Sequence, residues 1–316
     1  MKISGFTFIK NAESLYFPAK QAIESILPIC DEFVIALGES DPGDKTLELI
    51  QSIGSDKIKI VNTTWDTATY RRNTIYAQQT DVAKSACSGD WLFYIQGDEA
   101  VHEDDLDEVL KACRDNLDND QVEGFLFNYM HFWGDYWHYH RCHCWYRREI
   151  RLIRNLPNIH SWRDAQSFRK FDVWNDTFED YVKKESSHKL KVKQLNARVF
   201  HYGYVRPPRT LSKKTSSASA RYSDKDPAEQ EQQTVKTFYY GPLQNLNIFT
   251  GSHPAAMKEW IDQFNWKDDL QYYGERDMSK PLYKHERLKY RILSYIEDRF
   301  LGEREIGGFK NYQLLR

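Results

Sequence analysis

The stretch that decides the fold is Asp90-Trp91-Leu92-Phe93-Tyr94-Ile95-Gln96-Gly97-Asp98-Glu99. The five consecutive apolar or aromatic residues 91–95 are too few for a free-standing helix and are typical of a central strand covered on both faces. Gly97 would let a ligand approach the backbone, and Asp98 and Glu99 follow at the edge where open α/β sheets bind ligands. We therefore expect a divalent cation there, Mg²⁺ or Mn²⁺, with a phosphorylated substrate. The alternative is a solvated acidic turn before a helix.

The composition excludes a strong overall electrostatic field. The chain has 316 residues, with 44 Lys and Arg against 46 Asp and Glu and a formal net charge of -2. A nucleic-acid partner is therefore not expected, since no global positive charge would attract one. Aromatic residues are abundant, with 20 Tyr, 17 Phe and 9 Trp. Such rings commonly line clefts that stack against sugars or bases, although most of them should pack in the core.

Three features indicate a cytoplasmic protein. The amino terminus enters a strand pattern at once, without the apolar region and cleavage site of a secretion signal. No stretch approaches the roughly 20 apolar residues that span a bilayer, so no transmembrane anchor is expected. The cysteines are odd in number, which argues against a secreted disulfide framework. They are Cys30, Cys87, Cys113, Cys142 and Cys144.

The first half alternates strand and helix patterns. Repeated units of this kind predict an α/β fold with a mostly parallel sheet and helices on both faces. We expect strands at 3–9, 32–37, 57–61 and 91–95, and helices at 19–27, from Asp44 to residue 53, and at 73–87.

The pattern changes after an expected helix at 103–117. Longer strand patterns then predict antiparallel additions to the sheet, and a Pro pair at 207–208 suggests a boundary. We therefore expect domains at 1–206 and 207–316, the second a helical extension. The expected strands are 122–131, 144–154 and 197–202, with a loop-rich stretch at 157–187 and helices at 228–239, 254–264 and 287–300.

Acids and amides collect where the parallel strands should end. Glu39 or Asp41 could bond base or ribose hydroxyls, and Arg71 or Arg72 could reach a base or phosphate. The first strand is followed by 10–13, Lys-Asn-Ala-Glu, instead of a glycine-rich turn. This sequence argues against an ordinary Rossmann dehydrogenase or P-loop kinase.

These residues resemble the family 2 glycosyltransferases, inverting nucleotide-sugar enzymes with the GT-A fold. The turn at 39–46 resembles the family's acidic turn closing with Asp-any-Thr, and 94–99 resembles its metal-binding Asp-any-Asp-Asp tract. A bacterial branch that builds surface polysaccharides is similar at 146–154, 164–169 and 201–208. The resemblance covers residues 1 to about 210. Gln96 departs from it, because it replaces the first acid of the metal-binding tract.

The resemblance implies roles for individual residues. Asp98 would hold the metal, with Glu99 in support, and His201 would complete the metal or diphosphate site. Asp164 would be the base that removes the acceptor's proton; the rival carboxylates are Asp176, Glu179 and Asp180. We assign nucleotide-sugar binding, for a donor linked to UDP or GDP, to Phe8, Asn11, Glu13, Glu39, Asp41, Asp66, Arg71, Arg72, Gln96, Gly97 and Arg206.

Two further clusters have competing interpretations. His138, His140, Cys142, His143 and Cys144 are potential zinc ligands, but they lack the paired Cys-any-any-Cys hooks of structural zinc. The surrounding aromatics could instead form an acceptor wall or pack in the core. The tentative acceptor residues are Trp133, Trp137, Trp145 and Gln166.

The carboxyl-terminal region carries Lys213, Lys214, Lys284, Arg287 and Lys289 beside aromatic residues. Such residues could touch an anionic membrane that bears a lipid-linked acceptor, although solvated helix faces are the alternative.

The resulting hypothesis is a metal-dependent inverting glycosyltransferase that acts on a saccharide or lipid-linked acceptor in cell-surface polysaccharide biosynthesis. A sugar-phosphate nucleotidyltransferase is the alternative enzyme, and it should carry a glycine-rich basic loop after the first strand. A non-catalytic carbohydrate-binding protein on the same fold is the third possibility, which Gln96 favours.

Overall fold

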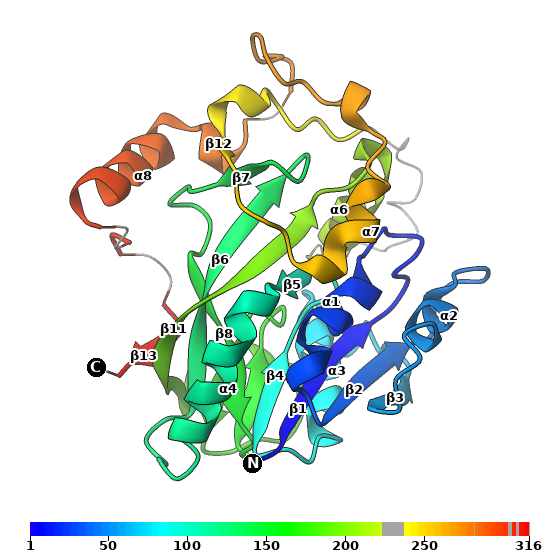
Figure 1. Cartoon of the computed structure of the whole chain (residues 1–316), viewed down its shortest axis with the longest axis vertical. Coiled ribbons are helices and arrows are strands. Elements are labelled where there is room, and N and C mark those ends of the chain that lie inside the picture. The colour runs from blue at the N-terminus through cyan, green and yellow to red at the C-terminus, as the bar shows by residue number, and fades with distance from the viewer. Residues whose placement is uncertain (223–236, 281, 303–304, 308–309, 316) are drawn as a thin grey trace.

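A computed structural model describes residues 1–222, 237–280, 282–302, 305–307 and 310–315. Its centre is one mixed sheet whose strands follow the order β3-β2-β1-β4-β8-β6-β11-β10-β9 (Figure 1). The first four are parallel, as the alternating pattern predicts. Their bounds are β1 Ile3–Ile9, β2 Glu32–Gly38, β3 Ile58–Thr63 and β4 Trp91–Tyr94.

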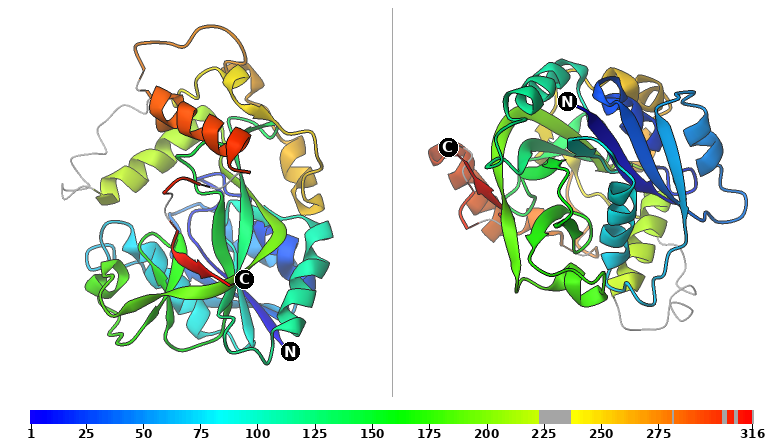
Figure 2. Two further views of the ribbon diagram at one scale, coloured as in Figure 1. Left: turned by 90° about the vertical axis from the view of Figure 1, so that its left-hand side faces the viewer. Right: turned by 90° about the horizontal axis from the view of Figure 1, so that it is seen from below.

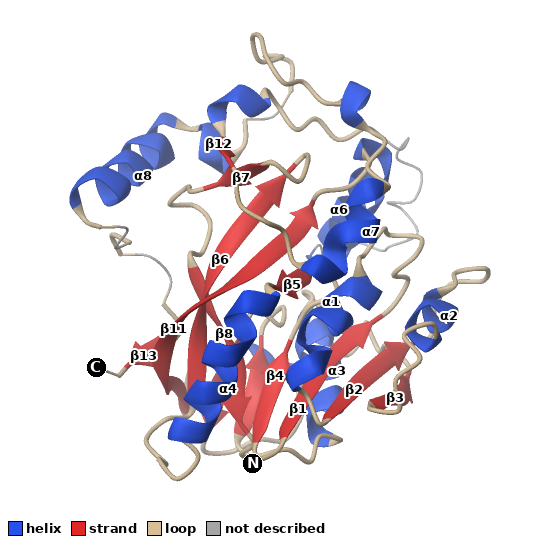
Figure 3. Cartoon of the chain, viewed as in Figure 1, coloured by secondary structure: helices blue, strands red, loops and turns tan. Residues whose placement is uncertain are grey.

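Helices cover both faces of the parallel part (Figure 3). One face packs against α1 and α4, and the opposite face packs against α3. Asp44 stabilises the start of α2, because its Oδ1 accepts a hydrogen bond of 2.9 Å from the Thr46 amide. The helices are α1 Ala19–Ile26, α2 Thr46–Gln51, α3 Thr74–Ser85 and α4 Leu106–Asp115.

The expected antiparallel additions are confirmed. Strand β8, Arg148–Arg154, runs antiparallel to both β4 and β6, which is Gly124–Trp133. Strand β11, Ser187–Tyr204, runs parallel to β6 and antiparallel to the short β5, Glu99–Val101. The chain that follows β4 is thereby held against β11, through the pairing of β5.

The expected loop at 157–187 is wrong in part. Two strands and one helix form there because the segment pairs with the amino-terminal end of β11, a long-range contact that local sequence does not encode. They are β9 Ile159–Trp162, β10 Ser167–Phe171 and α5 Phe178–Val182. The remaining short strands are β7 His138–His140, β12 Asn247–Ile248 and β13 Tyr312–Leu314.

Within the described residues, three α-helices follow β11. Helix α6 starts at Pro208, because proline suits the first turn of a helix, where its missing N–H costs nothing. The expected helix at 228–239 lies outside the described residues up to 236, and 237–239 are not helical. The helices are α6 Pro208–Tyr222, α7 Lys258–Asp262 and α8 Leu288–Phe300. Short 3-10 turns occur at Leu27–Ile29, Glu103–Asp105, Leu243–Asn245, Ala255–Met257, Lys267–Asp269 and Lys284–Glu286.

The carboxyl-terminal part shares a core with the sheet (Figure 2). Trp133 and Tyr202 from β6 and β11 belong to the same apolar cluster as Leu211, Leu243 and Trp266. The division at residue 206 therefore stays a prediction. In the described ranges, no helix combines the length and apolar character that crossing a bilayer requires.

Candidate active site

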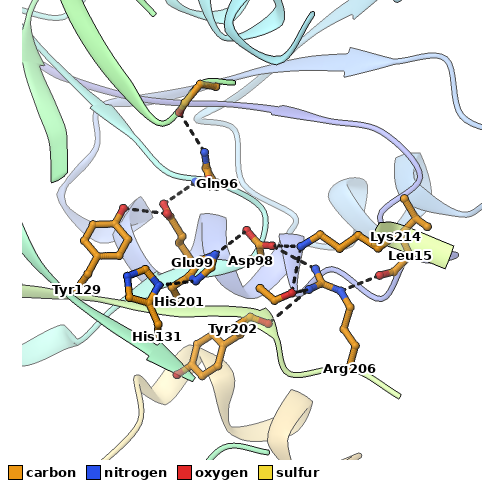
Figure 4. A network of polar contacts seen from close by, with 12 residues as sticks. Leu15, Gln96, Asp98, Glu99, Tyr129, His131, His201, Tyr202, Arg206 and Lys214 are labelled. Atoms are coloured by element: carbon orange, nitrogen blue, oxygen red, sulfur yellow. Dashed lines mark hydrogen bonds and ion pairs between the residues drawn. The ribbon is translucent and has the colours of Figure 1, made fainter. Parts of the chain in front are cut away.

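Strand pairing gathers the polar residues that follow β4 (Figure 4). In the sheet register, His201 on β11 lies opposite both Glu99 on β5 and His131 on β6. The Tyr202 amide also donates to the Asp98 carbonyl at 2.8 Å. Because residues 98 and 201 are held by neighbouring ladders, their side chains meet at the carboxyl-terminal edge of the parallel strands.

The two oxygens of Asp98 have different surroundings. Its Oδ2 accepts hydrogen bonds from Lys214 Nζ at 2.8 Å and Arg206 Nη2 at 3.3 Å, whereas Oδ1 lies 4.0 Å from His201 Nε2. Asp98 is only 5 % exposed. Its burial would raise the pKa, but attraction to the charges of Lys214 and Arg206, joined in acid by protonated His201, outweighs burial and holds the pKa well below the ordinary value. Asp98 is therefore a permanent anion.

Contact with His131 determines which nitrogen of His201 carries the proton. His131 Nε2 lies 2.7 Å from the Tyr146 carbonyl, which can only accept, so Nε2 carries the proton. Burial lowers the pKa of His131 to about 3 and that of His201 to about 4, so both rings are neutral near pH 7. His131 Nδ1 must then accept from His201 Nδ1 at 3.0 Å. The lone pair of His201 Nε2 is left facing Asp98.

Gly203 makes this placement of His201 possible. A Cβ at position 203 would lie 2.5 Å from both Cε1 and Nε2 of His201 and 3.3 Å from Asp98 Oδ2. The imidazole therefore fills the space of the missing side chain. Gly97 differs, because a Cβ there would meet only ordinary contacts at 3.7 Å or more, to Ala19 and Phe17.

Glu99 is engaged on both oxygens. Arg151 donates to its Oε2 from Nε at 2.9 Å and to its Oε1 from Nη2 at 2.8 Å. The Tyr129 hydroxyl and the Gln96 amide donate as well, at 2.8 and 3.0 Å. Both members of the Glu99–Arg151 pair are fully buried. The structure thus places Glu99 in a buried ion pair, and its expected support of a metal stays a prediction.

Arg206 and Lys214 supply positive charge beside Asp98. Arg206 is fully buried; its guanidinium donates to the Leu15 carbonyl at 3.0 Å and to the Gly203 carbonyl, and lies 4.3 Å from the Phe17 ring centre. Lys214 on α6 keeps a quarter of its side chain exposed. Burial and the nearby Arg206 lower its pKa to about 8. Arg206 therefore braces the site, while Lys214 is the cation that faces outward.

Sequence reasoning missed Lys214 in this role. The pattern assigns it to a basic surface patch, because the Pro pair suggests a boundary instead of the start of α6. Two turns into that helix, its side chain reaches back to Asp98. The available signal was Pro208 at a first helical position.

The ligand set suits a divalent cation. Asp98 Oδ1 and His201 Nε2 offer one carboxylate oxygen and one imidazole nitrogen, a combination that favours Mn²⁺ over Mg²⁺. Among the described residues, no group of three or more His, Cys, Asp or Glu side chains could hold a metal. Asp98 and His201 would therefore hold a cation only together with oxygens of a substrate or water.

A cleft of about 560 Å³ brings several predicted residues together. Asp164, Gln166, Trp145 and Arg72 line it, as does Glu305, which the sequence does not single out. Two backbone contacts tie this cleft to the Asp98 region: Gln96 Nε2 donates to the Ala165 carbonyl at 3.1 Å, and Arg151 Nη1 donates to the Gln166 carbonyl at 2.9 Å.

Residues with a positive φ flank Asp164 on both sides. Arg163 has φ 57° and Ala165 has φ 61°, a region that side chains with a Cβ rarely adopt. Ala165 is fully buried, and its carbonyl is the acceptor for Gln96. Gln96, the residue that departs from the acidic motif, therefore holds the Asp164 turn in its strained conformation.

Glu149 is a second buried carboxyl near this turn, which sequence reasoning did not identify. Burial raises its pKa to about 8, and the charge of Asp164 adds to the rise. Glu149 is therefore mostly protonated at neutral pH.

Three of the expected nucleotide-binding residues fasten two turns to each other. Asn11 exchanges two hydrogen bonds of 2.8 Å with Asp41, through the Asp41 amide and its Oδ2. Glu13 Oε2 accepts from the Lys45 amide at 2.9 Å. Phe8 stacks on Tyr76, with ring centres 5.5 Å apart. These contacts shape the edge of β1 and β2 where a nucleotide is expected.

Four further expected nucleotide-binding residues, Glu39, Asp66, Arg71 and Arg72, are exposed. Asp66 Oδ1 accepts from the Thr69 amide at 2.9 Å within its own turn, and the Glu39 side chain points to solvent. Arg71 lies 5.1 Å from the ring centre of Phe178, away from Arg72 in the cleft. Their predicted roles remain untested.

The aromatic residues suggested for the acceptor site lie in different places. Trp145 lines the cleft, but Trp133 is only 2 % exposed, and its indole N–H donates to the Tyr240 carbonyl. Trp133 therefore belongs to the core, the alternative that the sequence left open. Trp137 is exposed and packs against Phe264 with ring centres 5.5 Å apart, outside the residues that line the cleft.

The rival carboxylates have structural contacts. Asp180 forms a capping box with Thr177 at the start of α5, and Asp176 Oδ1 accepts from the Tyr181 hydroxyl at 2.8 Å. Glu179 is exposed. None of the three is among the residues that line the cleft.

The potential zinc ligands have other contacts. Asp135 binds His138, and Glu297 binds His143 at 2.6 Å. His140 packs against His285. All five cysteines are free thiols. In the described part of the chain these side chains do not converge in threes on a metal position.

Comparison with known proteins gives distant similarities. No protein-family model matches the chain. A stretch of 108 residues is 30% identical to an uncharacterized glycosyltransferase of Rickettsia bellii, and the match covers 34% of this chain and 31% of that protein. The chain thus spans about a third of the length of this curated relative.

Solved structures align more loosely. S. aureus TarS 1-349 in complex with UDP-GlcNAc aligns with 73% of this chain and 70% of its own, at 13% identity and a TM-score of 0.38. Glucosyl-3-phosphoglycerate synthase from Mycobacterium tuberculosis in complex with Mn²⁺, UDP and phosphoglyceric acid aligns with 40% of this chain and 42% of its own, at 17% identity and a TM-score of 0.27.

Proposed function

We propose that this protein is an inverting, metal-dependent glycosyltransferase of the family 2 type with a GT-A fold. It would transfer a sugar from a UDP- or GDP-linked donor to a saccharide or lipid-linked acceptor. The observation that carries the proposal is the pairing of Asp98 Oδ1 with the lone pair of His201 Nε2, 4.0 Å apart at the edge of the parallel strands. The curated relative that bears the name glycosyltransferase supports the same class.

The site residues fit the chemistry of this transfer. A bound divalent cation would neutralise the diphosphate as it leaves the sugar. Lys214, partly exposed beside Asp98, would add positive charge to the leaving group, while the buried Arg206 holds Asp98 in place. Asp164 lies in the adjoining cleft, where it would accept the proton of the acceptor hydroxyl.

The environment of Asp164 supports its role as the base. Glu149 keeps its proton at neutral pH, so it cannot accept another one. Asp164 is half-buried and lines the cleft beside Trp145 and Gln166, which would contact the acceptor. We therefore assign proton removal to Asp164.

A thermal-shift panel tests the function. The protein is mixed with UDP, GDP and their sugar conjugates, with and without Mn²⁺, because a ligand that binds only the folded state raises the melting temperature. We expect the melting temperature to rise with a nucleotide only when Mn²⁺ is present. In the Asp98→Ala variant, Mn²⁺ should no longer change the effect of the nucleotide. If no nucleotide gives a metal-dependent rise in melting temperature, the proposed glycosyltransferase function is refuted.

The alternatives predict other results. A sugar-phosphate nucleotidyltransferase needs a basic glycine-rich loop after β1, but the chain there turns through Asn11 and Glu13, which bind the next turn. A non-catalytic carbohydrate-binding protein would shift with saccharides and not with nucleotides. We place the reaction in cell-surface polysaccharide biosynthesis at the cytoplasmic side, following the bacterial branch that the sequence resembles.

A further inference from the structure

Helix α8 presents one apolar face to solvent. Leu288, Ile292 and Tyr295 follow the i, i+4, i+7 spacing of one helix face, and they are 70, 50 and 64 % exposed. Figures 1 and 2 show the helix at the periphery, outside the sheet and the helices that cover it. An ordinary surface helix turns such a face toward the core, so this orientation is the reverse of the usual one.

Polar contacts hold α8 in this orientation. Glu297, its buried residue, accepts from Arg147 Nη2 at 3.2 Å and lies 2.6 Å from His143 Nδ1. The Ser294 hydroxyl accepts from the His143 amide at 2.8 Å, and Asp298 accepts from Arg147 Nη1 at 2.8 Å. Glu297 is thus paired on the inner side of α8, and the exposed Asp298 is paired with Arg147; these contacts orient the apolar face outward.

Positive charge surrounds the exposed apolar face. Arg299 extends the face by one turn beyond Tyr295, and Arg291 and Lys289 lie on its two flanks; all three are exposed. Apolar side chains bordered by cations are complementary to an anionic lipid surface, where the helix lies in the plane of the headgroups.

We propose that α8 docks on an anionic membrane surface through Leu288, Ile292 and Tyr295. The same helix is bound to the cleft, because His143 both contacts Glu297 and lines the cleft beside Asp164. Glu305, just beyond α8, also lines it. A membrane-bound α8 would hold the cleft at the lipid surface, which favours a lipid-linked acceptor; this last step rests on the proposed glycosyltransferase function.

Vesicle sedimentation of the full chain without nucleotide tests the docking. We expect binding to vesicles of equal parts phosphatidylcholine and phosphatidylglycerol and little binding to phosphatidylcholine alone. The combined Leu288→Ser, Ile292→Ser and Tyr295→Ser variant should bind at least about tenfold more weakly, since both apolar burial and charge contribute. The matched control is Val173→Ser, an equally apolar side chain that is 58 % exposed elsewhere, and it should bind as the wild type does.

Two further measurements separate the outcomes. Combining Arg291→Glu with Arg299→Glu should abolish the preference for anionic vesicles. The Mn²⁺-dependent rise in melting temperature with nucleotide should be unchanged in all α8 variants. If the wild type shows no such rise, the proposed glycosyltransferase function is refuted, but the proposed membrane docking is not. Equal vesicle binding by the wild type and the triple variant would overturn the docking. A different result would also overturn the docking: the wild type forms a dimer and does not bind vesicles, and the triple variant is a monomer. In that case α8 would contact a second copy of the chain.

Discussion

His131 Nδ1 lies 3.0 Å from His201 Nδ1, and this contact determines the chemistry of His201. His131 Nε2–H donates a hydrogen bond to the Tyr146 carbonyl, so His131 Nδ1 can only accept from His201. His201 must then present an unprotonated Nε2 to Asp98. His131 is thus a positioning residue, which would act on the proposed metal ion through His201 without touching it.

The His131→Ala variant should therefore bind Mn²⁺ about 10- to 100-fold more weakly, the range measured when outer-shell partners of metal ligands are removed. The matched control is His253→Ala. His253 is also a buried histidine whose pKa burial lowers to about 4, but it contacts the Tyr202 hydroxyl and the Tyr136 carbonyl. Mn²⁺ titration followed by electron paramagnetic resonance measures both. Equal Mn²⁺ affinity in the two variants would contradict the proposed positioning of His201 by His131.

The sequence predicts the parallel strands well and places Asp98 directly after the fourth of them, because an apolar run that ends in acid is a local pattern. It does not predict His131 as a partner of His201, since the two are brought together by the pairing of β6 with β11, 70 residues apart. Lys214 is missed for the same reason, as helix α6 returns it to Asp98 across 116 residues. For Glu99 the motif position predicts support of a metal, and the structure adds a buried ion pair with Arg151 from β8, a long-range contact that the motif does not encode.

The Gly203→Ala variant should lose the metal site. Neither Gly203 nor Gly97 has a positive φ, so alanine costs no backbone strain at either position. At 203 the new Cβ would lie 2.5 Å from the His201 ring and displace it, which should lower Mn²⁺ affinity and cost about 1–3 kcal/mol of stability. Gly97→Ala is the control, because its Cβ would meet only ordinary contacts. Calorimetric Mn²⁺ titration and thermal unfolding measure both effects; wild-type affinity in Gly203→Ala would refute the steric argument.

Acid should destabilise the protein between about pH 6.5 and pH 4. Burial lowers the pKa of His131 to about 3 and those of His201, His253 and His285 to about 4, below the ordinary value near 6.5. Above pH 6.5 both folded and unfolded states are neutral there. Below it the unfolded chain binds protons first, so the free energy of unfolding falls by at most about 1.4 kcal/mol per pH unit for each histidine.

The His285→Phe variant tests that origin. Phenylalanine can keep the ring contacts with Trp133 and His140 but cannot bind a proton. Denaturant unfolding at a series of pH values should therefore show a shallower decline for the variant than for the wild type. Parallel declines would mean that other groups cause the acid sensitivity.

Asp164→Asn should abolish transfer and leave donor binding intact. The amide keeps the size of the side chain but cannot accept the acceptor's proton, and loss of a general base typically costs about 10²- to 10⁴-fold in rate. The strained residues Arg163 and Ala165 hold Asp164 in the cleft, and Gln96 anchors them at the Ala165 carbonyl. Gln96→Ala should therefore lower kcat less severely, by loosening the turn while the carboxylate remains.

The control for this series is Asp176→Asn. Asp176 accepts from the Tyr181 hydroxyl, and asparagine can keep that contact, so transfer should continue at the wild-type rate. Single-turnover transfer from a UDP- or GDP-sugar, together with the Mn²⁺-dependent thermal shift, separates chemistry from binding. Because the thermal shift reports donor binding alone, a normal shift with no transfer assigns the base to Asp164. Retained transfer in Asp164→Asn, with loss in Asp176→Asn, would instead place the base on the α5 side of the cleft.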